Sequence, residues 1–354
     1  SWVRRMFEVG LEMKRQYGED QVFDLSLGNP VLEPPKAFVR ELQRLAADPT
    51  PGMHRYMPNA GYPETRADVA THLARTTGLP FTLGDVVMTC GAGGGLNVVL
   101  KSILEPGDEV VLFAPYFPEY LFYIDNHGGE VRIAPTDDLF QPDLDALKSL
   151  LTERTRAVLV NSPNNPSGAV YSPEVLTGLG QLLASAEARF GRQIYLVGDE
   201  PYARLLYDGL SYPLLCRFHP SVIVATSFSK DLSLPGERIG YIAVNPDCGD
   251  RAELVDAFIF CTRVLGFVNA PALMQRAVRT VLDASVDLTW YQCQRDYVYN
   301  RLTAMGYSMV KPQGAFYAFP ATPTPDDVTF VRELLQERVL VTPGTGFGRP
   351  SHFR

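Results

Sequence analysis

The stretch VIVATSFSKDLSLPGERIGYIAV, residues 222–244, decides the fold of this chain. It begins and ends with apolar runs rich in Val and Ile, and such runs are typical of buried strands. Between the runs lie Ser227, Ser229 and Lys230, then a Pro-Gly turn and Arg238. We therefore expect hydroxyls and cations at the edge of a buried sheet, which is where α/β proteins bind their ligands.

Similar apolar runs recur along the chain at intervals that suit a large sheet. The expected strands lie at 86–89, 110–114, 130–134, 156–161, 194–198, 222–227 and 239–244. Helical patterns fill most of the intervals, at 94–104, 117–127, 142–152 and 173–190. Alternation of helices with continuously apolar strands predicts a mostly parallel sheet that helices cover on both faces. The expected fold class is therefore α/β, with three layers in the order α/β/α.

The pattern changes near residue 283, where a long expected helix at 287–304 precedes short strands and another helix. This change predicts a second, smaller α+β domain. We expect an N-terminal segment at 1–45, made of an arm and part of the small domain, a large domain at 46–282 and a small C-terminal domain at 283–354. The segment 48–63 is rich in Pro, Gly and Asn, which predicts a long loop of the kind that often serves function.

Composition argues against several classes of protein. The net charge of −8 argues against a nucleic-acid partner, because nucleic-acid binders are usually basic. The apolar runs are only of strand length and no signal peptide is visible, so we expect no membrane partner. The five cysteines are scattered without a CxxC pair, and the five histidines lack ligand spacing. These patterns predict a reducing, cytoplasmic location and no metal site.

The residues that follow the expected strands form a distinctive set. Each has an ordinary role if it is taken alone, as a turn, a cap or a packing aromatic. Their joint occurrence at the carboxyl ends of one sheet indicates a shared ligand. In chain order they are Ala92 and Gly93 in a glycine run after 86–89, Tyr116 after 110–114, Asn165 in an Asn-Asn-Pro-Ser-Gly turn after 156–161, Asp199 and Tyr202 after 194–198, and Ser227, Ser229 and Lys230 after 222–227.

One part of this set suits a phosphate. The glycine run precedes a helix, so its backbone N–H groups and the positive end of the helix dipole favour an anion. Ser227 and Ser229 add hydroxyl donors, and Arg238 adds a planar guanidinium that fits phosphate oxygens. We expect these groups to hold the phosphate of the ligand.

The remaining residues suit a flat ring that carries a nitrogen, a hydroxyl and an aldehyde. Tyr116 would stack on the ring face, and Asp199 would keep the ring nitrogen protonated. Asn165 and Tyr202 would donate hydrogen bonds to the ring hydroxyl. Lys230 would form a Schiff base with the aldehyde. Together the residues predict pyridoxal 5′-phosphate as the cofactor.

The sequence also resembles the class I/II aminotransferases of the aspartate aminotransferase superfamily, which are fold type I enzymes dependent on pyridoxal phosphate. The resemblance covers nearly the whole chain. It is most specific in a Ser-x-Ser-Lys element followed by an arginine, together with Asn-Asn-Pro-Ser-Gly and Asp-Glu-Pro-Tyr in the same order. The stretches that carry it are 26–30, 56–61 with Arg66, 161–168, 199–202, 227–238 and 352–354.

This resemblance implies an enzyme that moves an amino group between an L-amino acid and a 2-oxo acid. Lys230 would hold the cofactor and then carry the proton, with Asp199 and Tyr202 as the other catalytic residues. Arg354 would bind the substrate α-carboxylate, with Asn165 and Gly28 against the same substrate. In such enzymes the residue at Tyr56 reaches the phosphate in the neighbouring subunit, which implies a homodimer with shared active sites.

Other interpretations remain open at this point. A C–S β-lyase of the same fold would use the same residues, because the difference lies in the shape of the substrate pocket. A dinucleotide-binding enzyme would use the glycine run but leaves Lys230, Asn165 and Asp199 without a role. A non-catalytic regulator that binds the same cofactor would usually carry a DNA-binding extension, and no basic helical extension is visible. No second arginine is marked for a dicarboxylate substrate.

Overall fold

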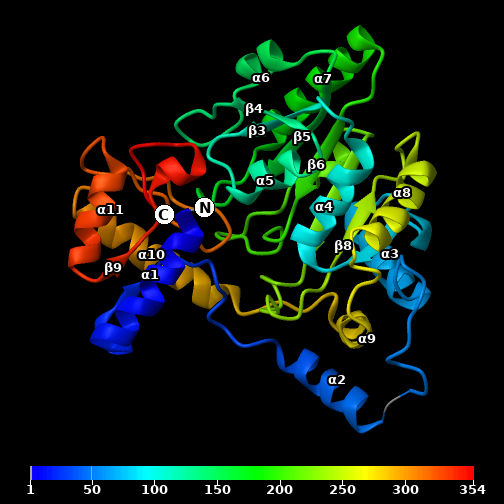
Figure 1. Cartoon of the computed structure of the whole chain (residues 1–354), viewed down its shortest axis with the longest axis horizontal. Helices are drawn as coiled ribbons and strands as arrows, with labels where there is room; N and C mark the ends of the chain where they lie inside the picture. Colours follow the sequence, from blue (N-terminus) through cyan, green and yellow to red (C-terminus); the bar gives the residue numbers. More distant parts are fainter. Residues whose placement is uncertain (1, 49) are drawn as a thin grey trace.

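The computed structural model describes residues 2–48 and 50–354. Ser1, where the expected N-terminal segment begins, and Pro49, in the expected loop 48–63, lie outside the described residues. The centre of the molecule is a seven-stranded sheet (Figure 1). Across the sheet its strands are β2 (Val86–Thr89), β8 (Gly240–Val244), β7 (Val222–Ser227), β6 (Tyr195–Asp199), β5 (Thr155–Asn161), β3 (Glu109–Phe113) and β4 (Glu130–Ala134).

The sheet is mostly parallel, as the sequence predicts. The exception is β8, which runs antiparallel to both of its neighbours, β2 and β7. Because β7 and β8 are adjacent and antiparallel, the loop between them needs no crossover. Lys230 follows the end of β7 and Arg238 precedes the start of β8, so this hairpin-like connection keeps both cations at the same edge of the sheet.

Helices cover both faces, which confirms the three-layer α/β/α fold. Side chains alternate along the strands, so that Val158 and Val160 of β5 belong to one apolar core and Ala157 and Leu159 to the other. The first core is covered by α2 (Lys36–Ala47), α3 (Pro63–Thr77), α6 (Leu144–Leu150), α7 (Pro173–Phe190) and α9 (Ala272–Val278). The second core is covered by α4 (Gly91–Ile103), α5 (Glu119–Asp125) and α8 (Arg251–Val264).

A smaller unit lies at one end of the molecule, where Figure 1 shows α1, α10 and α11 together. It joins the two ends of the described chain, because β1 (Phe23–Asp24) pairs in parallel with β9 (Val339–Leu340). Its helices are α1 (Trp2–Tyr17), α10 (Leu288–Ala304) and α11 (Asp327–Gln336). Met6 of α1 packs there with Val331 and Leu340. The short 3-10 helices are η1 (Glu19–Gln21), η2 (Leu83–Asp85), η3 (Leu215–Arg217), η4 (Arg279–Val281) and η5 (Gly344–Phe347).

Most expected elements are confirmed within two residues at each end, and two differences are larger or concern the division into units. The helix expected at 94–104 begins at Gly91, so the glycine run forms the first turns of α4 instead of a loop before it. The helix α2 falls mostly within the expected segment 1–45, yet its Phe38 and Leu45 pack in the core of the large unit. None of the helices within residues 2–48 and 50–354 has both the length and the apolar character that crossing a membrane requires.

Candidate active site

A cavity of about 350 Å³ opens at the carboxyl edge of the sheet. The last residues of three adjacent strands line it, namely Asn161 of β5, Asp199 of β6 and Ser227 of β7. The first turn of α4 and the small unit complete the walls. Parallel strands end at a common edge, which explains why residues far apart in sequence meet here.

Lys230 lies inside this cavity as a partly buried amine. Its Nζ donates a hydrogen bond of 2.8 Å to the backbone oxygen of Gly28. Burial, then the positive charges of Arg354 and Arg238, lower the pKa of Lys230 to about 8, and Asp199 opposes that shift. An amine with a pKa near neutrality can act as a nucleophile and as a proton carrier.

Asp199 presents one unsatisfied carboxylate oxygen. Its Oδ2 accepts a hydrogen bond of 2.5 Å from the hydroxyl of Tyr120. Its Oδ1 is buried and has no hydrogen-bond partner among the described residues. Burial raises the pKa of Asp199 to about 6, while the Tyr120 hydrogen bond and the charge of Lys230 lower it. A buried carboxylate oxygen without a donor is costly, so this atom suits a ligand that brings an N–H group.

A chain of hydrogen bonds connects the strand ends with Arg354. Asn161 donates from Nδ2 to the backbone oxygen of Asp199, 2.8 Å away, and accepts from the backbone N–H of Asn165. The Oδ1 of Asn165 accepts from Nη1 of Arg354 at 2.9 Å. Arg354 is 8% exposed, and burial lowers its pKa. Its Nη2 also donates to the backbone oxygen of Ser26, so the guanidinium is held in one orientation.

The opposite end of the cavity is rich in donors. Ala92 and Gly93 of α4 line it together with Ser227, Ser229 and Arg238. The guanidinium of Arg238 reaches the start of α4 only because position 91 is a glycine. A Cβ on Gly91 would lie 2.9 Å from Nη2 of Arg238, and Gly91 has a φ of +72°. A helix N-terminus, two hydroxyls and a guanidinium are together the groups that suit an anion site.

Gly28 and two tyrosines, Tyr202 of the large unit and Tyr317 of the small unit, form the wall where the two units meet. The hydroxyls of Tyr202 and Tyr317 are 2.7 Å apart and hydrogen-bonded. A Cβ on Gly28 would lie 2.1 Å from the Tyr317 hydroxyl, so any side chain at position 28 would displace that ring. Burial raises the pKa of Tyr202 well above its usual value, so its hydroxyl stays protonated and can donate a hydrogen bond.

Sequence comparison assigns the chain to a family. The family model described as "Aminotransferase class I and II" matches residues 20–354. This chain belongs to the class I and II aminotransferases. It transfers amino groups between amino acids and oxo acids, and the family match leaves the dinucleotide interpretation without support.

This chain is similar to known aminotransferases both in sequence and in structure. The aspartate/prephenate aminotransferase of Thermus thermophilus is 34% identical over 97% of this chain and 88% of its own length. A probable aspartate aminotransferase of Methanocaldococcus jannaschii is 29% identical over 92% of this chain and 85% of its own length. The crystal structure of an aminotransferase from Eubacterium rectale has a TM-score of 0.97 at 38% identity, covering 100% of this chain and 90% of that one.

The aminotransferase brings most of the expected site residues to one cavity. Those that line it are Gly28, Ala92, Gly93, Asn165, Asp199, Tyr202, Ser227, Ser229, Lys230, Arg238 and Arg354. Tyr120 and Tyr123, for which the sequence predicts no role, also line the cavity. They lie in α5 and follow Phe117, which lies just before that helix, by three and six residues, and this helical spacing was the available signal.

Tyr116, expected to stack on the ring, does not line the cavity. Its backbone N–H donates to the oxygen of Phe347, and its ring lies against Gly348, where a Cβ would be 2.6 Å from Cε1. The next residue, Phe117, lines the cavity instead. This backbone bond and the packing on Gly348 hold the buried Tyr116 away from the cavity, so the aromatic wall is displaced by one residue from the expected position.

Tyr56 also lies away from this cavity. Its side chain is 88% exposed, on a surface hollow that includes Arg55 and Asn269. Its expected role toward a neighbouring subunit therefore stays a prediction. Among residues 2–48 and 50–354, no group of three or more His, Cys, Asp or Glu side chains could hold a metal ion.

Proposed function

We propose that this aminotransferase uses pyridoxal 5′-phosphate, held covalently by Lys230. The observation that carries the proposal is the buried Oδ1 of Asp199, which lacks a partner among the described residues and belongs to a side chain lining the cavity. A protonated pyridine nitrogen is the donor that would satisfy it. The resulting ion pair would also offset the burial that raises the pKa of Asp199.

The other lining residues fit the remaining parts of the cofactor. The anion site would bind the phosphate through Ser227, Ser229, Arg238 and the first N–H groups of α4, at Ala92 and Gly93. Tyr202 and Asn165 would donate to the ring hydroxyl. Since the Oδ1 of Asn165 already accepts a hydrogen bond from Arg354, its amide N–H₂ group would donate the hydrogen bond to the ring hydroxyl. Phe117, in place of Tyr116, would contact the ring face.

Bound pyridoxal phosphate supplies an aldehyde that condenses with amines and a ring that acts as an electron sink. The residues of the chain position the substrate and move the proton. Arg354, held by Asn165 and Ser26, would bind the substrate α-carboxylate in a bidentate pair. The amine of Lys230, with its pKa lowered to about 8, would take the proton from the substrate Cα and return it.

We further propose a homodimer with shared active sites, because Tyr56 is 88% exposed on the loop that the resemblance assigns to the neighbouring subunit. We also propose a cytoplasmic location, which the five free cysteines support. The proposed domains are 46–282 and 283–354. From the N-terminal segment 1–45, α1 and β1 pack with the small unit and α2 packs with the large unit.

An absorbance spectrum of the purified protein with added pyridoxal phosphate tests the proposal. We expect a visible band that differs from that of the free cofactor. It should be lost in Lys230→Ala, together with turnover, while the far-ultraviolet circular dichroism of the variant stays unchanged. A wild-type spectrum equal to that of the free cofactor would rule out the cofactor, and retained turnover in Lys230→Ala would rule out the role of the lysine.

Single amino acids, added without an oxo acid, identify the donor. The panel includes aspartate and alanine, because related enzymes are named aspartate aminotransferase and alanine aminotransferase. A donor should change the spectrum and release its own oxo acid in an amount equal to the enzyme. Continuous release of pyruvate and ammonia would instead indicate β-elimination, the reaction of the C–S lyases.

A further inference from the structure

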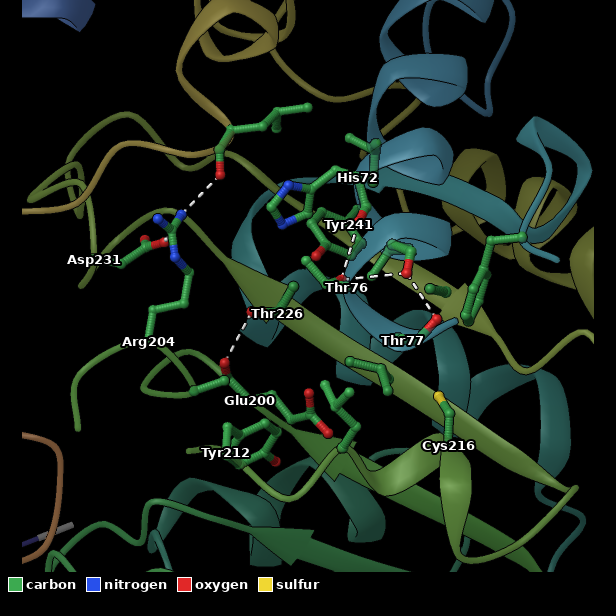
Figure 2. A pocket seen from close by; sticks show the side chains of 18 of the residues that line it. His72, Thr76, Thr77, Glu200, Arg204, Tyr212, Cys216, Thr226, Asp231 and Tyr241 are labelled. Carbon is green, nitrogen blue, oxygen red and sulfur yellow. Dashed lines mark hydrogen bonds and ion pairs between the residues drawn. The ribbon is translucent and has the colours of Figure 1, made fainter. Parts of the chain in front are cut away.

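A second cavity lies on the other face of the sheet, directly behind the first. Its volume is about 310 Å³, far more than the 10–15 Å³ that a single water needs. It lies between α3, the loop after β6 and the loop after β7, and Figure 2 shows the residues around it. Pro201 and Ser227 line both cavities, so only the sheet edge separates them.

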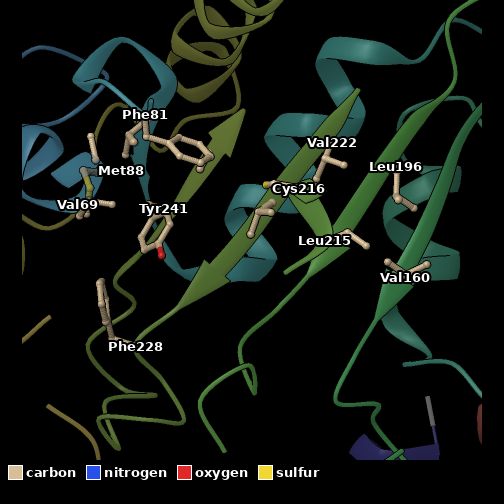
Figure 3. Packing of buried hydrophobic residues seen from close by; sticks show 14 of the residues in the cluster. Val69, Phe81, Met88, Val160, Leu196, Leu215, Cys216, Val222, Phe228 and Tyr241 are labelled. Carbon is tan, nitrogen blue, oxygen red and sulfur yellow. The ribbon is translucent and has the colours of Figure 1, made fainter. Parts of the chain in front are cut away.

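The walls of this second cavity combine an apolar surface with a few polar groups. The apolar part is the edge of the core that Figure 3 shows, including Phe81, Leu215 and Phe228. The polar part contains three acids, Glu200, Asp231 and Asp283, but only two arginines, Arg75 and Arg204. Small-molecule sites typically have this character, with an apolar surface and a few convergent polar groups.

Both arginines already have acidic partners. Arg204 lies 3.3 Å from Asp231 and donates to the backbone oxygens of Leu282 and Asp283. Arg75 pairs with the side chain of Asp283 at the exposed mouth of the cavity. His72 also contacts Asp283, and burial lowers the pKa of His72, so the imidazole adds no charge near neutral pH.

Glu200 is the acid of this lining that has no cationic partner among the described residues. Within residues 2–48 and 50–354, no lysine, arginine or histidine nitrogen lies within 4.0 Å of its carboxylate. Its Oε1 is buried and has no hydrogen-bond partner among the described residues. Figure 2 shows its carboxyl beside Tyr212, whose hydroxyl is hydrogen-bonded to Glu200. Burial raises the pKa of Glu200 to about 7, as expected for a carboxylate without a cation.

We propose that this second cavity is a binding site for a small organic cation, with its ammonium N–H on Oε1 of Glu200 and its apolar body on the core edge. The ligand supplies a positive charge to an acidic lining and the donor that Oε1 lacks, while Asp231, whose Oδ1 also lacks a hydrogen-bond partner among the described residues, keeps Arg204 as its cation. Its apolar body covers Phe81, Leu215 and Phe228. This site is separate from the amino-acid site, because Glu200 faces away from the cavity that contains Asp199.

Calorimetric titration with N-methylpiperidinium tests the proposal on the protein saturated with pyridoxal phosphate. A tertiary ammonium has an N–H donor but cannot condense with an aldehyde, so it does not compete at Lys230. We expect saturable binding at pH 8, where Glu200 is ionised. Tetrahydropyran, a neutral ring of similar size, should bind at least tenfold more weakly because it brings neither charge nor donor.

Two variants separate the role of Glu200 from a general effect of charge. Glu200→Gln keeps the size of the side chain and an acceptor for Tyr212, and should weaken the cation about tenfold or more. Asp283→Asn removes a carboxylate of the same cavity that is already paired, and should change affinity less than threefold. Absent binding, equal binding of both rings, or equal binding to Glu200→Gln would each overturn the proposal. If Glu200→Gln does not fold, the two rings on the unaltered protein decide.

Discussion

Asp199 and Glu200 are consecutive acids that serve two different cavities. Side chains alternate across a strand, so the residue that ends β6 and the residue after it point to opposite faces of the sheet. Asp199 lines the cavity with Lys230, and Glu200 lines the cavity behind it. Each has one buried carboxylate oxygen without a partner among the described residues. These two neighbouring acids therefore each leave one carboxylate oxygen that a hydrogen-bond donor could satisfy.

Without cofactor, Asp199 should make the stability of the protein depend on pH. Its pKa is raised in the folded state from 3.8 to about 6, so folding favours the protonated acid. The stabilisation is full below pH 3.8 and is lost as the pH rises through about 6. The corresponding free energy is about 3 kcal/mol. Urea unfolding should show that Asp199→Asn, which stays neutral, gains this amount over wild type between pH 4 and pH 7.

The same substitution should have the opposite effect once cofactor is bound. Asn cannot pair with a protonated ring nitrogen, so Asp199→Asn should bind pyridoxal phosphate more weakly than wild type. A parallel titration of both proteins with the cofactor measures this. A variant whose unfolding free energy follows wild type at every pH would contradict the burial argument, and unchanged cofactor affinity would contradict the assignment of the ring nitrogen.

At the scale of elements, the turn after β3 determines which aromatic residue faces the ligand. Tyr116 packs on Gly348 of the small unit, and Phe117 lines the cavity with its ring centroid 5.4 Å from that of Tyr120. Phe117→Ala should therefore weaken binding of pyridoxal phosphate several-fold, since an aromatic contact contributes about 1 kcal/mol. Tyr116→Ala is the matched control and should lower thermal stability with little change in affinity.

Fluorescence titration with the cofactor compares the two variants directly. A larger loss of affinity in Tyr116→Ala than in Phe117→Ala would return the stacking role to Tyr116. The comparison is informative because both residues lie in the same turn and both are aromatic, so loss of general packing affects both.

The strands and the residues at their ends could be predicted from sequence because they depend on local patterns. Apolar runs gave the seven strands, and the parallel arrangement brought Asn165, Asp199 and Lys230 to one edge. The placement of Tyr116 outside the cavity could not be predicted, because it depends on a backbone hydrogen bond to Phe347, far along the chain. The hydrogen bond that Asp199 accepts from Tyr120 could not be predicted either, because the two residues are distant in sequence.

The cavity behind the sheet gave no signal in the sequence. Glu200 is part of the Asp-Glu-Pro-Tyr motif, and the motif does not show which face of the sheet each acid serves. His72 and Asp283, which meet at the mouth of that cavity, come from distant segments. Only the packing of α3 and of the loop before α10 against the sheet brings them together.

At the scale of the whole molecule, the proposed homodimer predicts that subunits can complement each other. Lys230→Ala removes the lysine of its own subunit, and Tyr56→Ala would remove a phosphate contact from the partner's site. In a mixed dimer, one site would carry both defects and the other neither. Co-expression of the two variants should therefore restore activity well above that of either variant alone, as measured by oxo acid release.

Mixing the two purified homodimers without subunit exchange is the control, and should restore nothing. Light scattering on the same samples establishes the oligomeric state. Co-expressed subunits that form dimers but recover no activity would show that each subunit builds its site alone, and a monomeric wild type would exclude the shared site.

The pairing of β1 with β9 has a consequence for the order in which this protein folds during translation. Phe23 and Asp24 find their partners only after Val339 and Leu340 have been synthesised. Until then the apolar side of α1, including Met6, has no core to enter and stays available to chaperones or to other nascent chains. All strands of the large sheet lie between Val86 and Val244, so that sheet can form much earlier in translation. Synthesis therefore imposes an order of assembly in which the unit that contributes Gly28 and Arg354 closes the active site last.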